Sequence, residues 1–364
     1  MSDCPPILSI RELKQKATRI PVPGVVHAQA DRVERKESRN GNPYIELRLV
    51  DAEDQFTLRV WSDGPAFPMV ETVEPTALVA LAADWEQNEF GIDARSLKVR
   101  GLSPEEVTQF FGLAPEILQR QAADYASIRA TVNALADPRL KALCTSFLDQ
   151  HGERFQKTAA ARRNHHARRG GLVEHVAQMM RTAVAIQGVY PMLNRDLLVA
   201  GVLFHDCGKL WENYCPEGTF QMPHSMAGEL LSHIPFGMEL VNKLWRELKE
   251  SDQWSGWEQL EPTSEDVRLH LLHLIASHHG ELQFGSPVPP KTPEAFALHY
   301  VDNLDARLEM VKGAYANSQQ LAEGIFAKAW PLPGHLVTSL PKFAPATAPS
   351  PAEATDEEAE DEPF

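Results

Sequence analysis

The sequence predicts an α+β multidomain protein in which a small N-terminal β-barrel precedes an all-helical region. Two patterns carry this prediction. Polar and apolar residues alternate over residues 44–50 and again over residues 55–61, which is typical of strands with one face toward a core. From residue 103 onward apolar residues recur at helical spacing instead, and this pattern continues to about residue 328. A chain of 364 residues is long enough for each region to bury its own core.

Changes of pattern divide the chain into four parts. Residues 1–17 form a short leader with room for one small helix. Residues 18–102 hold short strands separated by turns, and an OB-fold is the small barrel that best matches them. Residues 103–330 are expected to be helical. We expect residues 331–364, which are rich in Pro, Ala and acids, to be a disordered tail.

Composition limits the class of protein. No apolar stretch reaches the roughly 18–20 residues that span a bilayer, so we expect no membrane partner. The first residues lack the pattern of a signal peptide, and the four cysteines form no CxxC pair, so we expect a cytoplasmic location. The net charge of −15 disfavours a nucleic-acid partner at first sight, but seven acids lie within residues 349–364 and the rest of the chain carries −8.

A basic strip lies within residues 154–169, and such a strip can bind phosphates even on an acidic protein. Its members are Arg154, Lys157, Arg162, Arg163, Arg168 and Arg169. A solvated helix face is the alternative interpretation of this strip.

The barrel also carries aromatic and cationic residues that suit single-stranded nucleic acid, because bases stack on exposed rings and cations contact the backbone. In the strand over residues 44–50, Tyr44 and Arg48 fall on the face opposite Ile45 and Leu47. Trp61 stands at a strand end, and we expect it in the core. Small barrels also mediate protein contacts, so the pattern leaves both uses open.

The most informative local feature is His205-Asp206, which ends the apolar run over residues 197–204. Burying a carboxylate costs about several kcal/mol unless a metal or a partner compensates it. Lys209 follows within reach of a phosphate at such a metal. Imidazoles and carboxylates without thiolates suit Mn, Fe, Mg, Ni or Zn at a hydrolytic site rather than a structural zinc. Further candidate ligands are spread along the helical region: His175, His233, His278, His279 and Asp302.

The order His175, His205-Asp206, Asp302 resembles the signature of the HD-domain phosphohydrolase superfamily. Together with the leading barrel, Gly170-Gly171 and Ser277-His-His-Gly280, the chain is similar to the bacterial HD-domain 3′–5′ exoribonucleases of the YhaM type over roughly residues 18–315. This resemblance implies an HD core at residues 160–315 and a divalent metal, most often Mn²⁺. It also implies hydrolysis of single-stranded RNA, and of single-stranded DNA as a further substrate, from the 3′ end.

The resemblance implies roles for individual residues. A first metal ion would be held by His175, His205, Asp206 and Asp302. Asp206 would bridge to a second ion held by His233, His278 and His279. Asp206 and Lys209 would act in catalysis, with Lys209 neutralising charge on the phosphoryl group in the transition state. Contacts to nucleic acid would come from Tyr44, Arg48, Arg162, Arg163, His165 and His166.

Three functions remain open at this point. The first is the exoribonuclease. The second is an HD phosphohydrolase of nucleotides, cyclic nucleotides or small phosphate esters, with the barrel as an interaction module. The third is a non-catalytic binding module with a relic site, against which the full ligand set argues. A homo-oligomer is compatible with each, and the insert over residues 245–266 has no assigned role.

Overall fold

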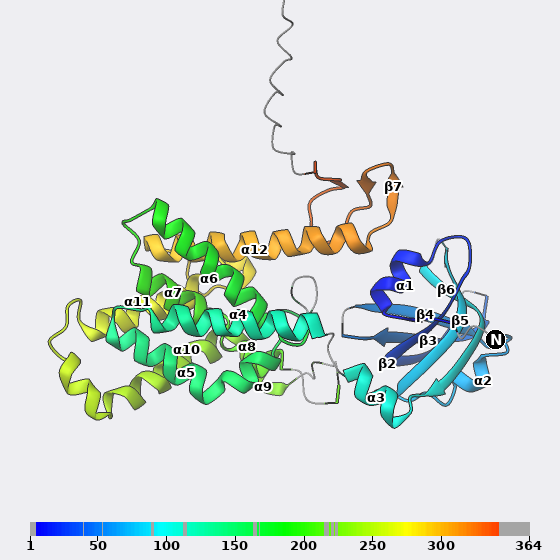
Figure 1. Ribbon diagram of the computed structural model, residues 1–364, viewed down its shortest axis with the longest axis horizontal. Coiled ribbons are helices and arrows are strands. Elements are labelled where there is room, and N and C mark those ends of the chain that lie inside the picture. Colours follow the sequence, from blue (N-terminus) through cyan, green and yellow to red (C-terminus); the bar gives the residue numbers. More distant parts are fainter. Residues whose placement is uncertain are drawn as a thin grey trace, which may run out of the picture.

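The computed structural model of this protein places a β-barrel beside a helical region (Figure 1). It describes residues 5–341, except residues 39, 53, 89–90, 112–114, 163–165, 167, 215–217, 220–221 and 223–224. Among the described residues, no helix has both the length and the apolar content needed to cross a bilayer.

The N-terminal strands form one sheet in the order β4-β3-β2-β5-β6, with antiparallel neighbours and with β1 added parallel to β2. The strands are β1 (Ile7–Leu8), β2 (Val22–Glu37), β3 (Pro43–Val50), β4 (Gln55–Trp61), β5 (Leu78–Asn88) and β6 (Gly91–Gly101). The first and last strands of this order, β4 and β6, also contact each other, so the sheet curls toward closure. This strand order, with the short helix α2 (Phe67–Val70) between β4 and β5, is that of an OB-fold barrel, as the sequence predicts.

The alternation over residues 44–50 places its apolar members inside the barrel. Ile45, Leu47 and Leu49 are buried, whereas Tyr44 and Arg48 lie half-buried on the outer face. Trp61 is on that outer face as well, because it pairs with Tyr44 across β3 and β4 and remains 42% exposed. The expectation that Trp61 belongs to the core is therefore wrong. A residue at the end of a strand follows the alternation of its own strand, and β4 turns Trp61 outward.

The barrel is sealed by helix α1 (Ile10–Lys16), which inserts Ile10 and Leu13 into the barrel core. Ser9 and Glu12 form a capping box at its start, so the side chains of these two residues satisfy backbone N–H groups that the first turn leaves free. Helix α1 also contacts α12, and Thr219 donates a hydrogen bond to Gln29 of β2. The barrel therefore touches the helical region at more than one place.

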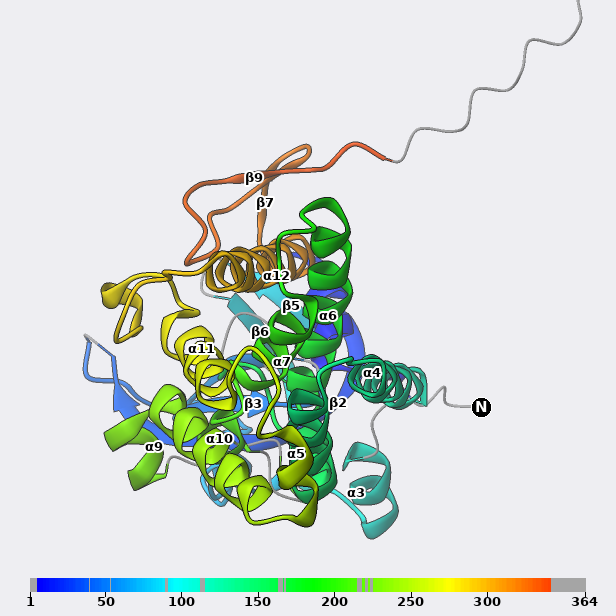
Figure 2. The same cartoon turned by 90° about the vertical axis from the view of Figure 1, so that its left-hand side faces the viewer.

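The helical region is built around α7 (Arg195–Phe204), whose residues from Leu197 to Phe204 are all buried. Helices α5, α6, α11 and α12 contact it (Figure 2). A helix that is apolar on every face must be surrounded in this way. The helices are α3 (Pro104–Phe111), α4 (Pro115–Asn133), α5 (Pro138–Lys157), α6 (Gly171–Val189), α7, α8 (Lys209–Glu212), α9 (Met226–Leu231), α10 (His233–Lys249), α11 (Ser264–Ser277) and α12 (Pro293–Asn317), with 3-10 turns η1 (Asp252–Trp257) and η2 (Leu282–Phe284).

Two segments are ordered although the sequence assigns no role to one and predicts disorder for the other. Within the insert over residues 245–266, Trp245 and Trp254 are buried and their rings lie 5.7 Å apart, so the insert packs on the helical core. The prediction of disorder from residue 331 is wrong for residues 331–341. There β9 (Leu336–Val337) pairs with β8 (Ile325–Phe326), which pairs with β7 (Gln320–Ala322), and the Tyr315 hydroxyl donates to the Val337 carbonyl. Residues 342–364 of that tail lie outside the described residues.

The barrel core supplies a test of this packing. Trp85 is fully buried, and its Nε1 donates a 3.0 Å hydrogen bond to the Gly24 carbonyl. Trp85→Phe removes this donor and part of the ring, so we expect the free energy of unfolding to fall by about 1–3 kcal/mol in urea titrations followed by circular dichroism. The matched control is Trp61→Phe, which should change it by less than about 0.5 kcal/mol. Equal effects of the two substitutions would contradict the assignment of Trp85 to the core.

Candidate metal centre

The ligands expected from the sequence come from five separate segments that meet at the C-terminal end of α7. His175 lies in the second turn of α6, and His205-Asp206 directly follow α7. His233 begins α10, His278-His279 follow α11, and Asp302 lies in α12. Because α7 is the central helix, the residues at its end are within reach of all the helices around it.

The first group of side chains surrounds the Nε2 atom of His175. This atom lies 3.3 Å from His205 Nε2, 3.3 Å from Asp302 Oδ1 and 3.8 Å from Asp206 Oδ2. His205 Nε2 is in turn 3.3 Å from the same Asp206 oxygen. Two imidazole nitrogens and two carboxylate oxygens thus face one point.

The second group lies on the other side of Asp206. The Oδ1 atom of Asp206 is 3.5 Å from His233 Nε2 and 3.7 Å from His278 Nε2. The rings of His278 and His279 have centroids 4.1 Å apart, and His233 and His279 are 5.1 Å apart. One potential ligand atom each from His233, His278 and His279 fit within 4.8 Å of one another. Asp206 therefore presents one oxygen to each group.

The ring nitrogens that point away from these groups all have oxygen partners. Nδ1 of His205, His278 and His279 lies 2.9, 2.8 and 2.7 Å from the carbonyls of Val202, Ile275 and Phe284. A carbonyl only accepts, so these three rings carry their proton on Nδ1 and turn a lone pair at Nε2 inward. Nδ1 of His175 and His233 instead meets carboxylates, Asp305 at 2.7 Å and Glu212 at 3.0 Å. This is the arrangement that orients metal-binding histidines in proteins.

The inward atoms fit a cation. Asp206 Oδ1, His233 Nε2 and His278 Nε2 are buried, and none of them has a hydrogen-bond partner among the described residues. Buried polar atoms without partners are costly, and three that converge could together hold a metal ion. The donor set of imidazole and carboxylate, without thiolate, suits a hydrolytic divalent ion.

Electrostatics at the site favour positive charge between the groups. Burial lowers the pKa of His278 well below its usual value, so this ring is neutral and ready to ligate. Burial also opposes protonation of His175, but Asp302 and Asp305 outweigh it and raise the pKa of His175 to about 9. Burial disfavours the charged form of Asp206, yet Lys209 and His205 hold its pKa well below the usual value. The carboxylates are thus ionised and attract either a proton or a metal cation.

Lys209 belongs to the same site. Its Nζ lies 2.6 Å from Asp206 Oδ2, and the residue is buried except for 9% of its surface. A phosphate that binds next to Asp206 would therefore meet this ammonium group.

Two carboxylates at the site received no role from the sequence. Asp305 contacts both His175 and His166, the latter at 3.0 Å, and Glu212 contacts His233. Asp305 follows Asp302 by three residues on α12, and this helical spacing is the signal that indicates it. Glu212 follows Lys209 by three residues, but nothing in the sequence indicates its pairing with His233.

His166 and Arg162, which the sequence assigns to nucleic-acid contacts, both make internal contacts in the structure. Only 3% of His166 is exposed, and its Nε2 lies 3.0 Å from Asp305. His166 therefore contacts the carboxylate that orients the ring of His175. Arg162 donates to the carbonyls of Met222 and Glu212 and thereby holds the chain that follows α8. Arg163 and His165 lie outside the described residues.

The basic strip is also largely engaged in internal contacts. Arg154 donates to the Leu210 carbonyl and lies over the Tyr214 ring, Lys157 pairs with Glu153, and Arg168 pairs with Glu174. These cations cross-link loops and helices, so the strip offers less free charge than the sequence suggests.

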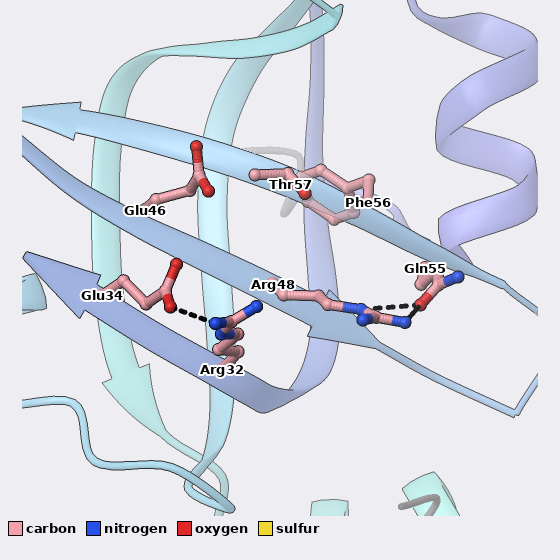
Figure 3. Close-up of a pocket in the computed structure, with 7 residues that line it drawn as sticks. All are labelled: Arg32, Glu34, Glu46, Arg48, Gln55, Phe56 and Thr57. Carbon is pink, nitrogen blue, oxygen red and sulfur yellow. Dashed lines mark hydrogen bonds and ion pairs between the residues drawn. The ribbon is translucent and has the colours of Figure 1, made fainter. Parts of the chain in front are cut away.

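On the barrel, Tyr44 and Arg48 stay on the outer face. The ring of Tyr44 lies 4.9 Å from that of Trp61, which makes an aromatic pair on this face. Arg48 contacts Gln55 and Asp31 and lines a shallow depression formed by β2, β3 and β4 (Figure 3). Arg32 and Glu34, which pair with each other, line it too, so the depression carries charges of both signs.

Comparison with known families finds a match at the metal centre. Residues 172–307 match the family model described as "HD domain". HD domains bind divalent metals and indicate a metal-dependent phosphohydrolase, in agreement with the convergence of His and Asp side chains. The HD part of the predicted resemblance is therefore confirmed.

Solved structures with similarity to this chain include isolated OB-fold domains. The second OB-fold domain of replication protein A from Methanococcus maripaludis is 13% identical, with a TM-score of 0.20, and the match covers 27% of this chain and 95% of that one. The OB domain of a Thermoplasma acidophilum protein is 10% identical with the same score, over 27% and 88%. Asparaginyl-tRNA synthetase from Pyrococcus horikoshii is 12% identical with a TM-score of 0.21, over 70% and 62%. The barrel assignment rests on the strand order of this chain itself.

Gly208 tests whether the helices need their observed spacing. A Cβ atom on this residue would lie 1.9 Å from the His233 carbonyl oxygen and 2.8 Å from the Gly237 nitrogen, so α10 would have to move. We expect Gly208→Ala to lower the free energy of unfolding by about 1–3 kcal/mol and to reduce metal affinity measured by titration calorimetry, because His233 moves away from Asp206.

The matched control is Gly188→Ala in α6, where nothing lies within 4 Å of the added carbon. It should be neutral or stabilise by up to about 1 kcal/mol. Unchanged stability and metal affinity of Gly208→Ala would show that α10 does not need this close approach.

Proposed function

We propose that this protein, whose residues 172–307 match the HD domain, is a metal-dependent 3′–5′ exoribonuclease that hydrolyses single-stranded RNA. The observation that carries the proposal is the position of Asp206, which turns one oxygen to His175 and His205 and the other to His233 and His278. Such a bridging carboxylate suits a pair of divalent ions, the arrangement that enzymes of phosphodiester cleavage use.

His175, His205, Asp206 and Asp302 would hold one ion, and His233, His278 and His279 would hold the other. A pair of divalent ions supplies an activated water and stabilisation of the leaving oxygen. Mn²⁺ is our first candidate, and Mg²⁺, Fe²⁺, Ni²⁺ and Zn²⁺ fit the same donor atoms. Lys209, held on Asp206, would place its charge beside the phosphoryl oxygens in the transition state.

The barrel would capture the strand. Its outer face carries the Tyr44–Trp61 pair, on which bases can stack, and Arg48 further along the same face of β3. The preference for RNA and the 3′ to 5′ direction follow from the resemblance to the YhaM-type enzymes.

One observation favours a second candidate, a phosphohydrolase of nucleotides, cyclic nucleotides or small phosphate esters. Several cations on the barrel face are paired with acids: Lys36 and Arg59 both contact Glu46, and Arg32 contacts Glu34. Such pairs reduce the attraction for a polyanion. Turnover of mononucleotides without any shortening of strands would select this candidate, with the barrel as an interaction module.

Asp206 gives the decisive substitution. With Mn²⁺ and a 5′-labelled RNA, we expect the wild-type protein to give a ladder that shortens from the 3′ end and disappears with EDTA. Asp206→Ala should abolish the ladder, because it removes a ligand from both groups, while the Kd for the uncleaved strand stays within about threefold of the wild-type value.

Asp149→Ala is the matched control, since Asp149 is a surface carboxylate of α5 that pairs with Arg129 of α4. It should retain full activity. An active Asp206→Ala enzyme would refute the proposed metal centre.

The role of the barrel is tested by replacing Tyr44 and Trp61 together with Ala. Base stacking on an aromatic ring contributes about 1–3 kcal/mol, so KM for long strands should rise at least fivefold while kcat on a dinucleotide stays unchanged. Identical KM values for long strands in both proteins would remove the barrel from substrate capture.

A further inference from the structure

An exposed apolar turn directly follows two of the candidate ligands. After His278-His279 the chain forms η2, and the side chains of Leu282 and Phe284 in this turn are 68% and 61% exposed. Exposure of these two large apolar side chains to water is unfavourable, and their position directly after two candidate metal ligands requires an explanation.

The turn is fixed to the metal centre rather than loosely attached. Nδ1 of His279 donates to the Phe284 carbonyl at 2.7 Å. Phe284 therefore orients the candidate ligand His279 through its backbone while its own aromatic ring is exposed. His299 Nδ1 lies 2.8 Å from the His278 carbonyl. Gly280 has a φ of +83°, and the His299 ring fills the space where a Cβ would be, 2.3 Å away. Backbone bonds from Phe284 to Glu281 and from Gly285 to Leu282 close the turn.

We infer that Leu282 and Phe284 form a shelf on which a nucleobase stacks while the phosphate of the same nucleotide binds at the metal centre. The occupant follows from chemistry: a ligand of the ions and Lys209 must offer phosphate oxygens, and a ligand of Phe284 must offer a flat apolar face. A nucleotide combines the two within the reach of one residue. This inference deepens the proposed function and rests on it for the phosphate end of the ligand.

The shelf would add a second position for base stacking to the aromatic pair of the barrel. Tyr44 and Trp61 can hold bases along the strand, but they belong to the other region of the chain. A base held beside the ions fixes the scissile phosphate itself, and accurate placement of the reacting group is a large part of catalysis.

The test compares a nucleotide with its counterpart that lacks the base. In titration calorimetry with Mn²⁺ present, we expect the full-length protein to bind AMP about tenfold more tightly than ribose 5-phosphate. Phe284→Ala should bring the two affinities together by weakening AMP only. Phe284→Trp, which keeps a flat ring, should retain the preference, and Phe284→Leu should lose most of it.

Tyr190→Ala is the matched control, because Tyr190 is 57% exposed and follows α6 at its far end, about 22 Å along the helix from His175. It should keep the preference for AMP. Affinity for Mn²⁺ should be the same in all variants. The group that orients His279 is the backbone carbonyl of residue 284, and the side-chain substitutions leave it in place.

Equal affinities of AMP and ribose 5-phosphate in the wild-type protein, or a preference that survives in Phe284→Ala, would overturn the shelf. Failure of the proposed function gives a different result. In that case the protein leaves labelled RNA and DNA strands intact but still prefers AMP through Phe284, and the shelf then serves a nucleotide phosphohydrolase.

Discussion

The buried carboxylate of Asp206 is the constraint on which the helical region depends. An ionised group at the end of a fully apolar helix is stable only if positive or hydrogen-bonding partners surround it. The chain supplies the Lys209 ammonium group at 2.6 Å from Asp206 Oδ2. Under the proposed assignment, the remaining positive charge comes from cations held between Asp206 and the imidazoles of His175, His205, His233 and His278. The packing that buries α7 and the set of polar groups around its end are therefore two aspects of one arrangement.

A second layer of carboxylates and carbonyls gives the centre its order. Asp305 and Glu212 fix the rings of His175 and His233, and backbone carbonyls fix three others. Asp305 extends further, through His166, to the segment before α6. Glu174 and Arg168 pair next to this contact, so that the loop, α6 and α12 share one buried polar network. Such a network restricts the orientation of the side chains that belong to it, including the ring of His175.

The sequence predicts the fold class and the candidate ligands because both depend on local signals. Alternation over residues 44–50 defines a strand, and an apolar run that ends in His205-Asp206 has few explanations other than a buried polar site. Long-range pairing leaves no such signal. Glu212 and Asp305 meet their histidines across 21 and 130 residues of chain. Asp305 is indicated only by its helical spacing from Asp302, and Glu212 resembles any surface acid. The contact of His166 with Asp305 leaves no local signal either, because 139 residues of chain separate the two. The proposed shelf at Phe284 could not be predicted from the sequence, because the exposure of an apolar residue is a property of the folded chain.

The wide separation of the ligands along the chain has a thermodynamic consequence. The candidate ligands run from residue 175 to residue 302 and come from separate helices. Under the proposed assignment, an ion that binds them all acts as a reversible cross-link over this span, and the unfolded chain cannot reproduce the site. The free energy of folding then includes a contribution that grows with the logarithm of the free metal concentration. The stability of the helical region would thus depend on the free metal concentration around the protein. A shortage of metal would destabilise the fold as well as remove the activity.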